Sequence, residues 1–119
     1  MNYSIATTEY FESNFKRLLK KYHSLDDDIE ILKKELLENP TIGNDLGGNI
    51  RKVRMAIASK NKGKRGGARV KTCHVLVDVV NTKIYLLAIF DKGEQASISK
   101  KDVIQLKKQS GLQPRYASA

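Results

Sequence analysis

Residues 50–70 read IRKVRMAIASKNKGKRGGARV, and this stretch decides the fold. Its first part alternates between apolar and basic side chains, a period of two that is typical of a strand with one apolar face: Val53, Met55 and Ile57 against Lys52 and Arg54. The glycine- and lysine-rich run at 59–67 predicts a flexible basic loop. A second strand is expected after this loop, from Ala68 to about Asp78. Two strands joined by a basic loop therefore form the centre of the predicted domain.

The residues after this stretch predict a third strand and a last helix. Asn81 and Thr82 are expected to make a turn. The strand that follows, 83–91, is apolar on both faces, so it should lie centrally in the sheet. Ser97 or Ser99 can then cap a helix that ends at Gly111.

The residues before the stretch predict a helical hairpin. Thr7 or Thr8 can cap a first helix, because apolar residues recur after it at helical spacing. A second helix opens within 24–28 and stops at 39–40, where Asn is followed by Pro. A short first strand is expected near 3–6.

The predicted fold class is therefore α+β. A small domain is expected in which the N-terminal helical hairpin packs on a small, mostly antiparallel β-sheet, with a C-terminal helix. The 119 residues fit a single domain over 1–110, followed by a flexible tail over 111–119.

The net charge of +9 comes from one segment. The chain has 22 Lys and Arg against 13 Asp and Glu, and between Asp45 and Asp78 there are nine bases and no acid. The other 13 bases equal the 13 acids, so the rest of the chain is formally neutral. Such a one-sided segment favours a polyanionic partner, with nucleic acid ahead of a membrane surface, because the segment lacks the aromatic and leucine face of an interfacial helix.

Other classes of protein fit the sequence less well. No apolar run reaches the roughly 20 residues of a membrane-spanning helix, and the first residues lack the pattern of a secretory signal. Cys73 is the single cysteine, so we expect a buried thiol and a reducing, cytoplasmic setting. The acids of 26–28 suit the first turn of a helix better than a metal, and we expect neither metal nor cofactor.

The basic residues of neighbouring strands are expected to converge. Lys52 and Arg54 share a strand face, Arg69 opens the next strand, and Lys92 follows the third. Such a cluster suits phosphate, and crowded lysines with a lowered pKa can transfer a proton during cleavage of RNA by its own 2′-hydroxyl. Composition alone favours binding without cleavage.

Further residues are candidates for contact with RNA. The other bases of the segment are expected to bind RNA or the ribosome: Arg51, Lys60, Lys62, Lys64, Arg65 and Lys71. Tyr85 and Phe90 can stack on bases, although core packing is the more usual role on a central strand.

These residues together resemble a known family. The stretch 50–70, followed by IYLLAIFDK at 84–92 and by Glu94, resembles the RelE/HigB toxins of bacterial type II toxin–antitoxin modules. It is most similar to the HigB-like branch, and the Asn39-Pro40 helix end with Gly43 also matches the family layout. The resemblance covers roughly residues 7–108.

The resemblance implies a RelE-like fold and a ribosome-dependent, metal-independent endoribonuclease that cleaves translated mRNA in the A site of the 70S ribosome. It also implies neutralisation by a cognate antitoxin, in a hetero-oligomer. It puts Lys52 and Arg54 on the strand that faces the mRNA, Arg69 on the scissile phosphate, and Lys92 in the basic stretch after the last core strand. Some members have an arginine and a tyrosine just after that stretch, whereas residues 93–99 here contain neither.

Two other readings stay open. A ParE-like toxin shares the fold and inhibits DNA gyrase, without RNA chemistry. A catalytically degenerate relative would bind only nucleic acid and antitoxin. The nine-base segment favours the mRNA reading, because binding to gyrase does not by itself require a phosphate site.

Overall fold

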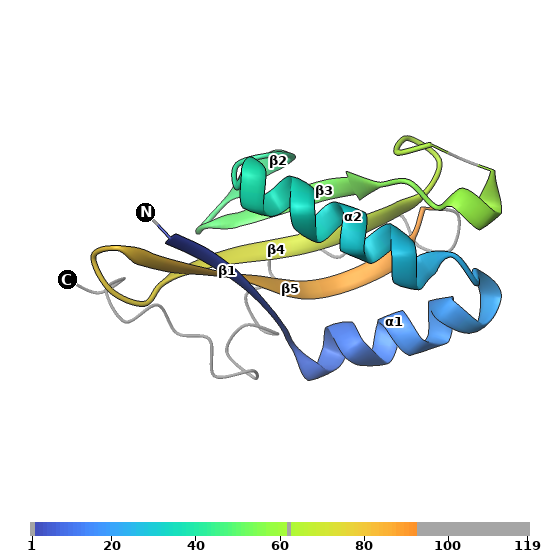
Figure 1. The fold of residues 1–119 in the computed structure, drawn as a ribbon, viewed down its shortest axis with the longest axis horizontal. Coiled ribbons are helices and arrows are strands. Elements are labelled where there is room, and N and C mark those ends of the chain that lie inside the picture. The colour runs from blue at the N-terminus through green and yellow to red at the C-terminus, as the bar shows by residue number, and fades with distance from the viewer. Residues whose placement is uncertain (1, 62, 93–119) are drawn as a thin grey trace.

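A computed structural model of the chain describes residues 2–61 and 63–92. Its elements in chain order are β1 (Asn2–Thr7), α1 (Glu9–Lys21), α2 (Leu25–Glu38), β2 (Asn44–Gly47), β3 (Ile50–Met55), the short 3-10 helix η1 (Ala58–Lys60), β4 (Ala68–Leu76) and β5 (Asn81–Asp91) (Figure 1). The predicted α+β class is confirmed. The predicted last helix, Lys62 and the tail lie outside the described residues.

Both helices of the predicted hairpin form close to their predicted positions. The Thr8 hydroxyl accepts a hydrogen bond from the Phe11 N–H at 3.1 Å and so caps α1. The second helix begins directly after Ser24, and its last residue is Glu38, immediately before the predicted stop at Asn39 and the proline. Asp28, from the acidic run, is buried and accepts a hydrogen bond from the Ser24 hydroxyl at 2.6 Å. Among the described residues, neither helix is long and apolar enough to cross a membrane.

The sheet has five strands in the order β1-β5-β4-β3-β2. β1 pairs with β5 in parallel and the other pairs are antiparallel, which confirms a mostly antiparallel sheet. β5 has a neighbour on each side, as its two apolar faces predicted, although β4 is the middle strand.

One expectation about the strands was wrong, and one strand was missed. Asn81 and Thr82 do not form the turn but begin β5, because the Asp78 carboxylate accepts the N–H groups of Val80 and Asn81 at 2.9 Å and closes the turn earlier. β4 begins at Ala68 as predicted and ends at Leu76, two residues before the approximate end expected at Asp78. β2 was not predicted, because its residues lack the alternation of a strand; it forms as the partner of β3 across a tight turn with positive φ angles at 47–49.

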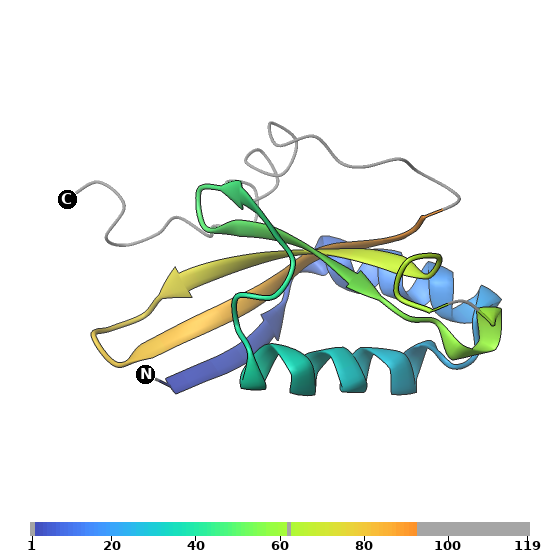
Figure 2. The same cartoon turned by 90° about the horizontal axis from the view of Figure 1, so that it is seen from above.

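The main core lies between the helices and one face of the sheet. Phe11, Leu18, Leu32 and Leu36 pack there against the inward side chains of β3, β4 and β5, and Figure 2 shows α2 on that side. The opposite face carries a small apolar cluster of Ile50, Cys73 and Leu87. Cys73 is fully buried, as expected for a structural thiol.

A bulge in β5 shifts the alternation of its side chains. Thr72 pairs with Leu86 but Lys71 pairs with Ala88, so Leu87 is an extra residue. Beyond the bulge, Ile89 packs in the main core instead of facing away from the helices. Asp91 is likewise turned to the helix side of the sheet.

Candidate nucleic-acid interface

Two pairs of cations lie next to each other on the sheet face that points away from the helices. In the β3–β4 register Lys52 lies opposite Lys71, and Arg54 lies opposite Arg69. Side chains directly opposite each other start about 4.5–5.5 Å apart, where like charges repel. The predicted convergence of Lys52, Arg54 and Arg69 is thus present in the strand register. Four cations on one face of two strands form a site that an anion would stabilise.

Lys71 is the most deeply buried of these cations, with 2% of its surface exposed. Burial lowers its pKa, and the positive charge of Lys52 lowers it further. A lowered pKa raises the fraction of neutral amine at pH 7. Lys71 is therefore the member of this group with the clearest capacity to accept or release a proton.

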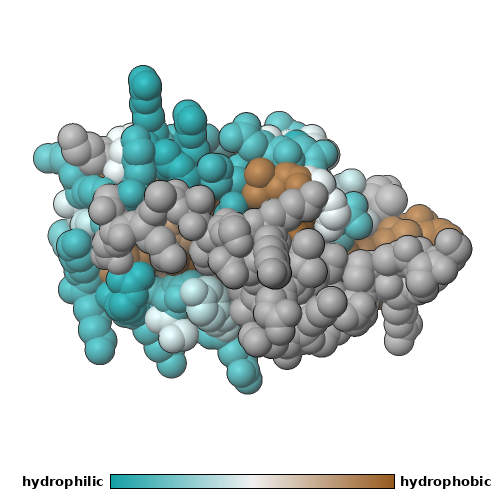
Figure 3. All heavy atoms as spheres, turned by 180° about the vertical axis from the view of Figure 1, so that it is seen from behind, coloured by the Kyte–Doolittle hydropathy of each residue, from teal (hydrophilic) through white to brown (hydrophobic). Residues whose placement is uncertain are grey.

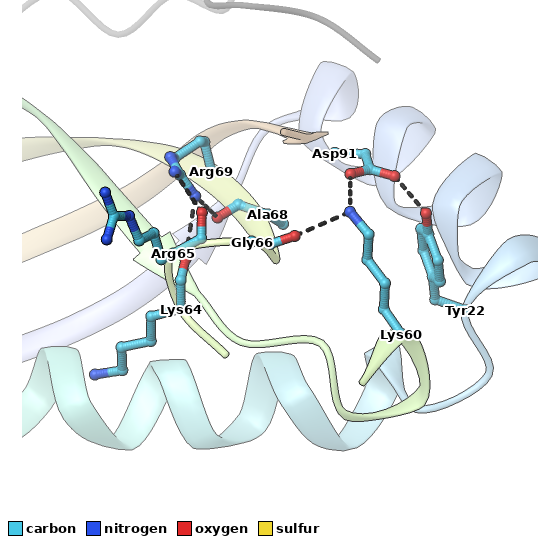
Figure 4. A network of polar contacts seen from close by, with 8 residues as sticks. All are labelled: Tyr22, Lys60, Lys64, Arg65, Gly66, Ala68, Arg69 and Asp91. Atoms are coloured by element: carbon cyan, nitrogen blue, oxygen red, sulfur yellow. Dashed lines mark hydrogen bonds and ion pairs between the residues drawn. The ribbon is translucent and has the colours of Figure 1, made fainter. Parts of the chain in front are cut away.

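The buried side chain of Arg69 is hydrogen-bonded to the backbone of the basic loop. Its side chain is 7% exposed, and the guanidinium donates to the carbonyls of Lys64 at 3.1 Å, Arg65 at 2.9 Å and Ala68 at 3.1 Å (Figure 4). Burial and the charge of Arg54 lower its pKa. The loop that was expected to be flexible is thus anchored on the residue predicted to bind phosphate.

Lys60 joins the two ends of the same loop. Its Nζ lies 2.6 Å from Asp91 Oδ1 and donates to the Gly66 carbonyl at 2.9 Å. The Tyr22 hydroxyl donates to the other oxygen of Asp91, and Lys60 Nζ lies 5.8 Å from the centre of the Tyr22 ring (Figure 4). The charge of Lys60 is therefore paired inside the protein.

The remaining loop cations differ in their partners. Lys64 reaches α2 and pairs with Glu35 at 2.6 Å, whereas Arg65 is exposed and no partner for its guanidinium is seen among the described residues. A cleft of about 360 Å³ lies between α2, the residues before β2, and β3. Its lining includes Lys52, Arg54, Lys64 and the acidic partner of Lys64, Glu35, with the apolar Ile42 and Val53. The cleft therefore presents charges of both signs beside apolar surface.

Other predicted residues lie apart from the paired cations. Arg51 alternates to the helix side of the sheet, where it donates to the carbonyls of Ile42 at 3.2 Å and Gly43 at 3.3 Å. Lys92 is exposed, and its backbone N–H donates to Gly67 at 3.2 Å, next to the start of β4.

The two aromatic candidates also differ in exposure. Phe90 is 2% exposed and Tyr85 is half-buried. This burial fits core packing by Phe90, and base stacking stays a prediction.

Neither Asp91 nor Tyr22 was assigned a functional role from the sequence. The available signal was an acid that closes an otherwise apolar strand immediately before Lys92. Sequence spacing does not show which base it meets, because Lys60 lies 31 residues earlier. Glu35, the partner of Lys64, was likewise one of several acids along a helix.

One comparison with known proteins identifies a related family. A family model described as the RelE toxin of the RelE / RelB toxin–antitoxin system matches residues 9–117, which include both helices and the sheet residues that carry the paired cations.

Proposed function

Because the chain belongs to the RelE toxin family and is the toxin component of a toxin–antitoxin system, we propose that it is a ribosome-dependent endoribonuclease that cleaves translated mRNA. The observation that carries the proposal is the pairing of Lys52 with Lys71 and of Arg54 with Arg69 on one sheet face. Repulsion between these like charges is relieved when a phosphodiester lies over them.

The paired cations supply what RNA cleavage by its own 2′-hydroxyl requires. A base removes the 2′-hydroxyl proton, the oxygen attacks the adjacent phosphorus, and the 5′-oxygen leaves with a proton. Arg54 and Arg69 would stabilise the charge that develops on the phosphate oxygens. Lys52 and Lys71 would exchange the protons, because burial and the charge of Lys52 lower the pKa of Lys71. Lys92, beside the start of β4, would bind a flanking phosphate. The reaction written this way uses no metal ion.

The partners follow from the same charge distribution. The family implies a cognate antitoxin of the RelB type, and an acidic segment of that antitoxin would complement the basic sheet face and loop. The ribosome would place mRNA over the cation pairs, with exposed Arg54 and Arg65 on its phosphates. A cytoplasmic location belongs to the same proposal, as does membership of the HigB-like branch.

The test is induction of the chain in a bacterial host, followed by primer extension on a translated message. Wild type should produce cuts within codons, only while the message is translated. Arg69→Ala should produce none, and Arg54→Ala should produce few. Lys34→Ala, which removes an exposed charge from α2, should cut like wild type.

Two outcomes would contradict the proposal. Growth arrest without cuts would favour a target such as DNA gyrase. An absence of both arrest and cuts would favour a degenerate protein that binds only nucleic acid and antitoxin.

A further inference from the structure

We propose that the Asp91–Lys60 ion pair positions Arg69 for RNA cleavage by closing the basic loop 60–67, without touching the RNA itself. The inference rests on the proposed function. It makes Asp91 and Lys60 positioning residues, although Lys60 was predicted from the sequence to bind RNA directly.

The first step is that Lys60 ties the beginning of the loop to its end. Its ammonium group bridges Asp91 Oδ1 at 2.6 Å and the Gly66 carbonyl at 2.9 Å. One side chain at the start of the loop therefore fixes the backbone six residues later. The same loop end is held by the Lys92 N–H, which donates to Gly67 at 3.2 Å.

The second step is that the loop backbone orients Arg69. The Lys64 and Arg65 carbonyls, which directly precede Gly66, accept hydrogen bonds from the Arg69 guanidinium. If Gly66 is released, these two acceptors move and the guanidinium loses its orientation. Figure 4 shows the continuous sequence of contacts from Tyr22 through Asp91, Lys60 and Gly66 to Arg65 and Arg69.

The third step is that Asp91 is itself fixed. Its side chain is 3% exposed, and the bulge at Leu87 turns it to the helix side of the sheet. There the Tyr22 hydroxyl, from the end of α1, donates to its second carboxylate oxygen. A buried carboxylate held from two elements is a rigid anchor for the ammonium group.

Electrostatics and positioning predict opposite results for the loss of this carboxylate. Asp91→Asn raises the net charge by one, so long-range attraction alone would tighten RNA binding. If Asp91 acts through Lys60 on the loop, the same change must weaken RNA binding and slow cleavage. Asp26→Asn is the matched control, because it makes the same charge change at an exposed position in the first turn of α2.

The experiment measures single-turnover mRNA cleavage on programmed ribosomes, affinity for a short single-stranded RNA, and amide exchange of residues 63–67. We expect Asp91→Asn and Lys60→Met each to lower the cleavage rate at saturating ribosome by about 10- to 100-fold. The double variant should be no slower than the slower single variant, because both changes break one contact. Amides 63–67 should exchange faster in all three.

Each contrary result is decisive. A wild-type rate in Asp91→Asn, or RNA affinity that tightens as in Asp26→Asn, would overturn the proposal. If Asp91→Asn does not fold, Tyr22→Phe removes only the hydroxyl that holds Asp91 and should slow cleavage by a smaller factor; an unchanged rate would overturn the proposal.

Failure of the proposed function is distinguishable from failure of this inference. If the wild-type protein makes no cuts and binds no RNA, the proposed endoribonuclease function is wrong. Amide exchange is then the only test of whether the Asp91–Lys60 ion pair holds the loop. Unchanged exchange of 63–67 in Asp91→Asn would then show that Asp91 does not hold the loop, and faster exchange would show that it does.

Discussion

Lys52 on β3 lies directly opposite Lys71 on β4, and Lys71 is buried. Two ammonium groups in this relationship repel each other, and the buried one also loses hydration. The fold tolerates the repulsion and the lost hydration beside a second cationic pair, Arg54 and Arg69, which is the next pair on the same face of the two strands. Costs of this kind concentrate at binding and catalytic sites.

Lys71→Met should stabilise the free protein. Its pKa is lowered by burial and by Lys52, so the folded state binds fewer protons than the unfolded chain between the lowered pKa and the ordinary pKa of lysine. The penalty is complete below the folded pKa and disappears as pH rises above the unfolded pKa. We expect a gain of about 1 kcal/mol at pH 7, or a few degrees in Tm, which shrinks toward pH 10 and above. Thermal unfolding across pH measures it, and a lower Tm at pH 7 would contradict the reading.

Arg69→Gln and Arg54→Gln should separate stability from RNA binding. Arg69→Gln removes a guanidinium that holds three carbonyls, so the free energy of unfolding should fall by about 1–3 kcal/mol. Arg54 is exposed, and its substitution should change stability by no more than about 0.5 kcal/mol. Both should impair cleavage. Urea unfolding compares the two variants, and equal stability losses would show that the loop contacts of Arg69 contribute nothing.

The salt dependence of RNA affinity should report which loop cations face the RNA. Arg65→Gln removes an exposed charge and should lower the slope of log K against log salt by about 0.7 for a single strand. Lys60→Gln should change the slope less, because Asp91 already neutralises that charge. Lys34→Gln on α2 is the control. Titration of a short RNA at several salt concentrations measures all three, and equal slopes for Arg65→Gln and wild type would exclude Arg65 from the interface.

Gly67→Ala should destabilise the fold much more than Gly63→Ala. A Cβ at Gly67 would lie 2.1 Å from the Met55 carbonyl oxygen, whereas one at Gly63 meets nothing within 4 Å. The clash involves backbone on both sides, so the strands must separate, at a cost of about 1–3 kcal/mol or more. Gly63→Ala should stay near wild type. Thermal unfolding of the two variants checks this, and a stable Gly67→Ala would contradict the close approach of the loop end to β3.

One exposed apolar surface has no role in these predictions. Leu76, Val77, Val79 and Val80, at the β4–β5 hairpin, are 39–88% exposed. Figure 3 shows hydrophobic side chains at that end of the molecule and mostly hydrophilic ones at the other. The hairpin lies far along the sheet from the basic loop, so substitutions there provide surface controls for the RNA experiments.

Local sequence patterns were sufficient to predict most of the helices and strands, and to predict that Lys52 and Arg54 share one face of their strand. The Thr8 cap, the stop at Asn39 and the alternation of Lys52 with Val53 each depend on residues close in sequence, and each was predicted. β2 was missed because its pairing with β3, and not its own residue pattern, makes it a strand.

Contacts between distant residues decided how the site is held. Strand alternation along β5 would place Asp91 on the face away from the helices, but the bulge at Leu87 turns it toward Tyr22 and Lys60. Composition likewise gives Lys60, Lys64 and Arg65 the same charge, whereas the fold pairs the first with Asp91, the second with Glu35, and leaves the third exposed. The sequence pattern specifies the strand face on which each side chain lies and the charge that it carries, because both depend only on residues close together in the chain. Which charges remain available to a ligand depends on the approach of segments some 30 residues apart, and only the packed structure sets that approach.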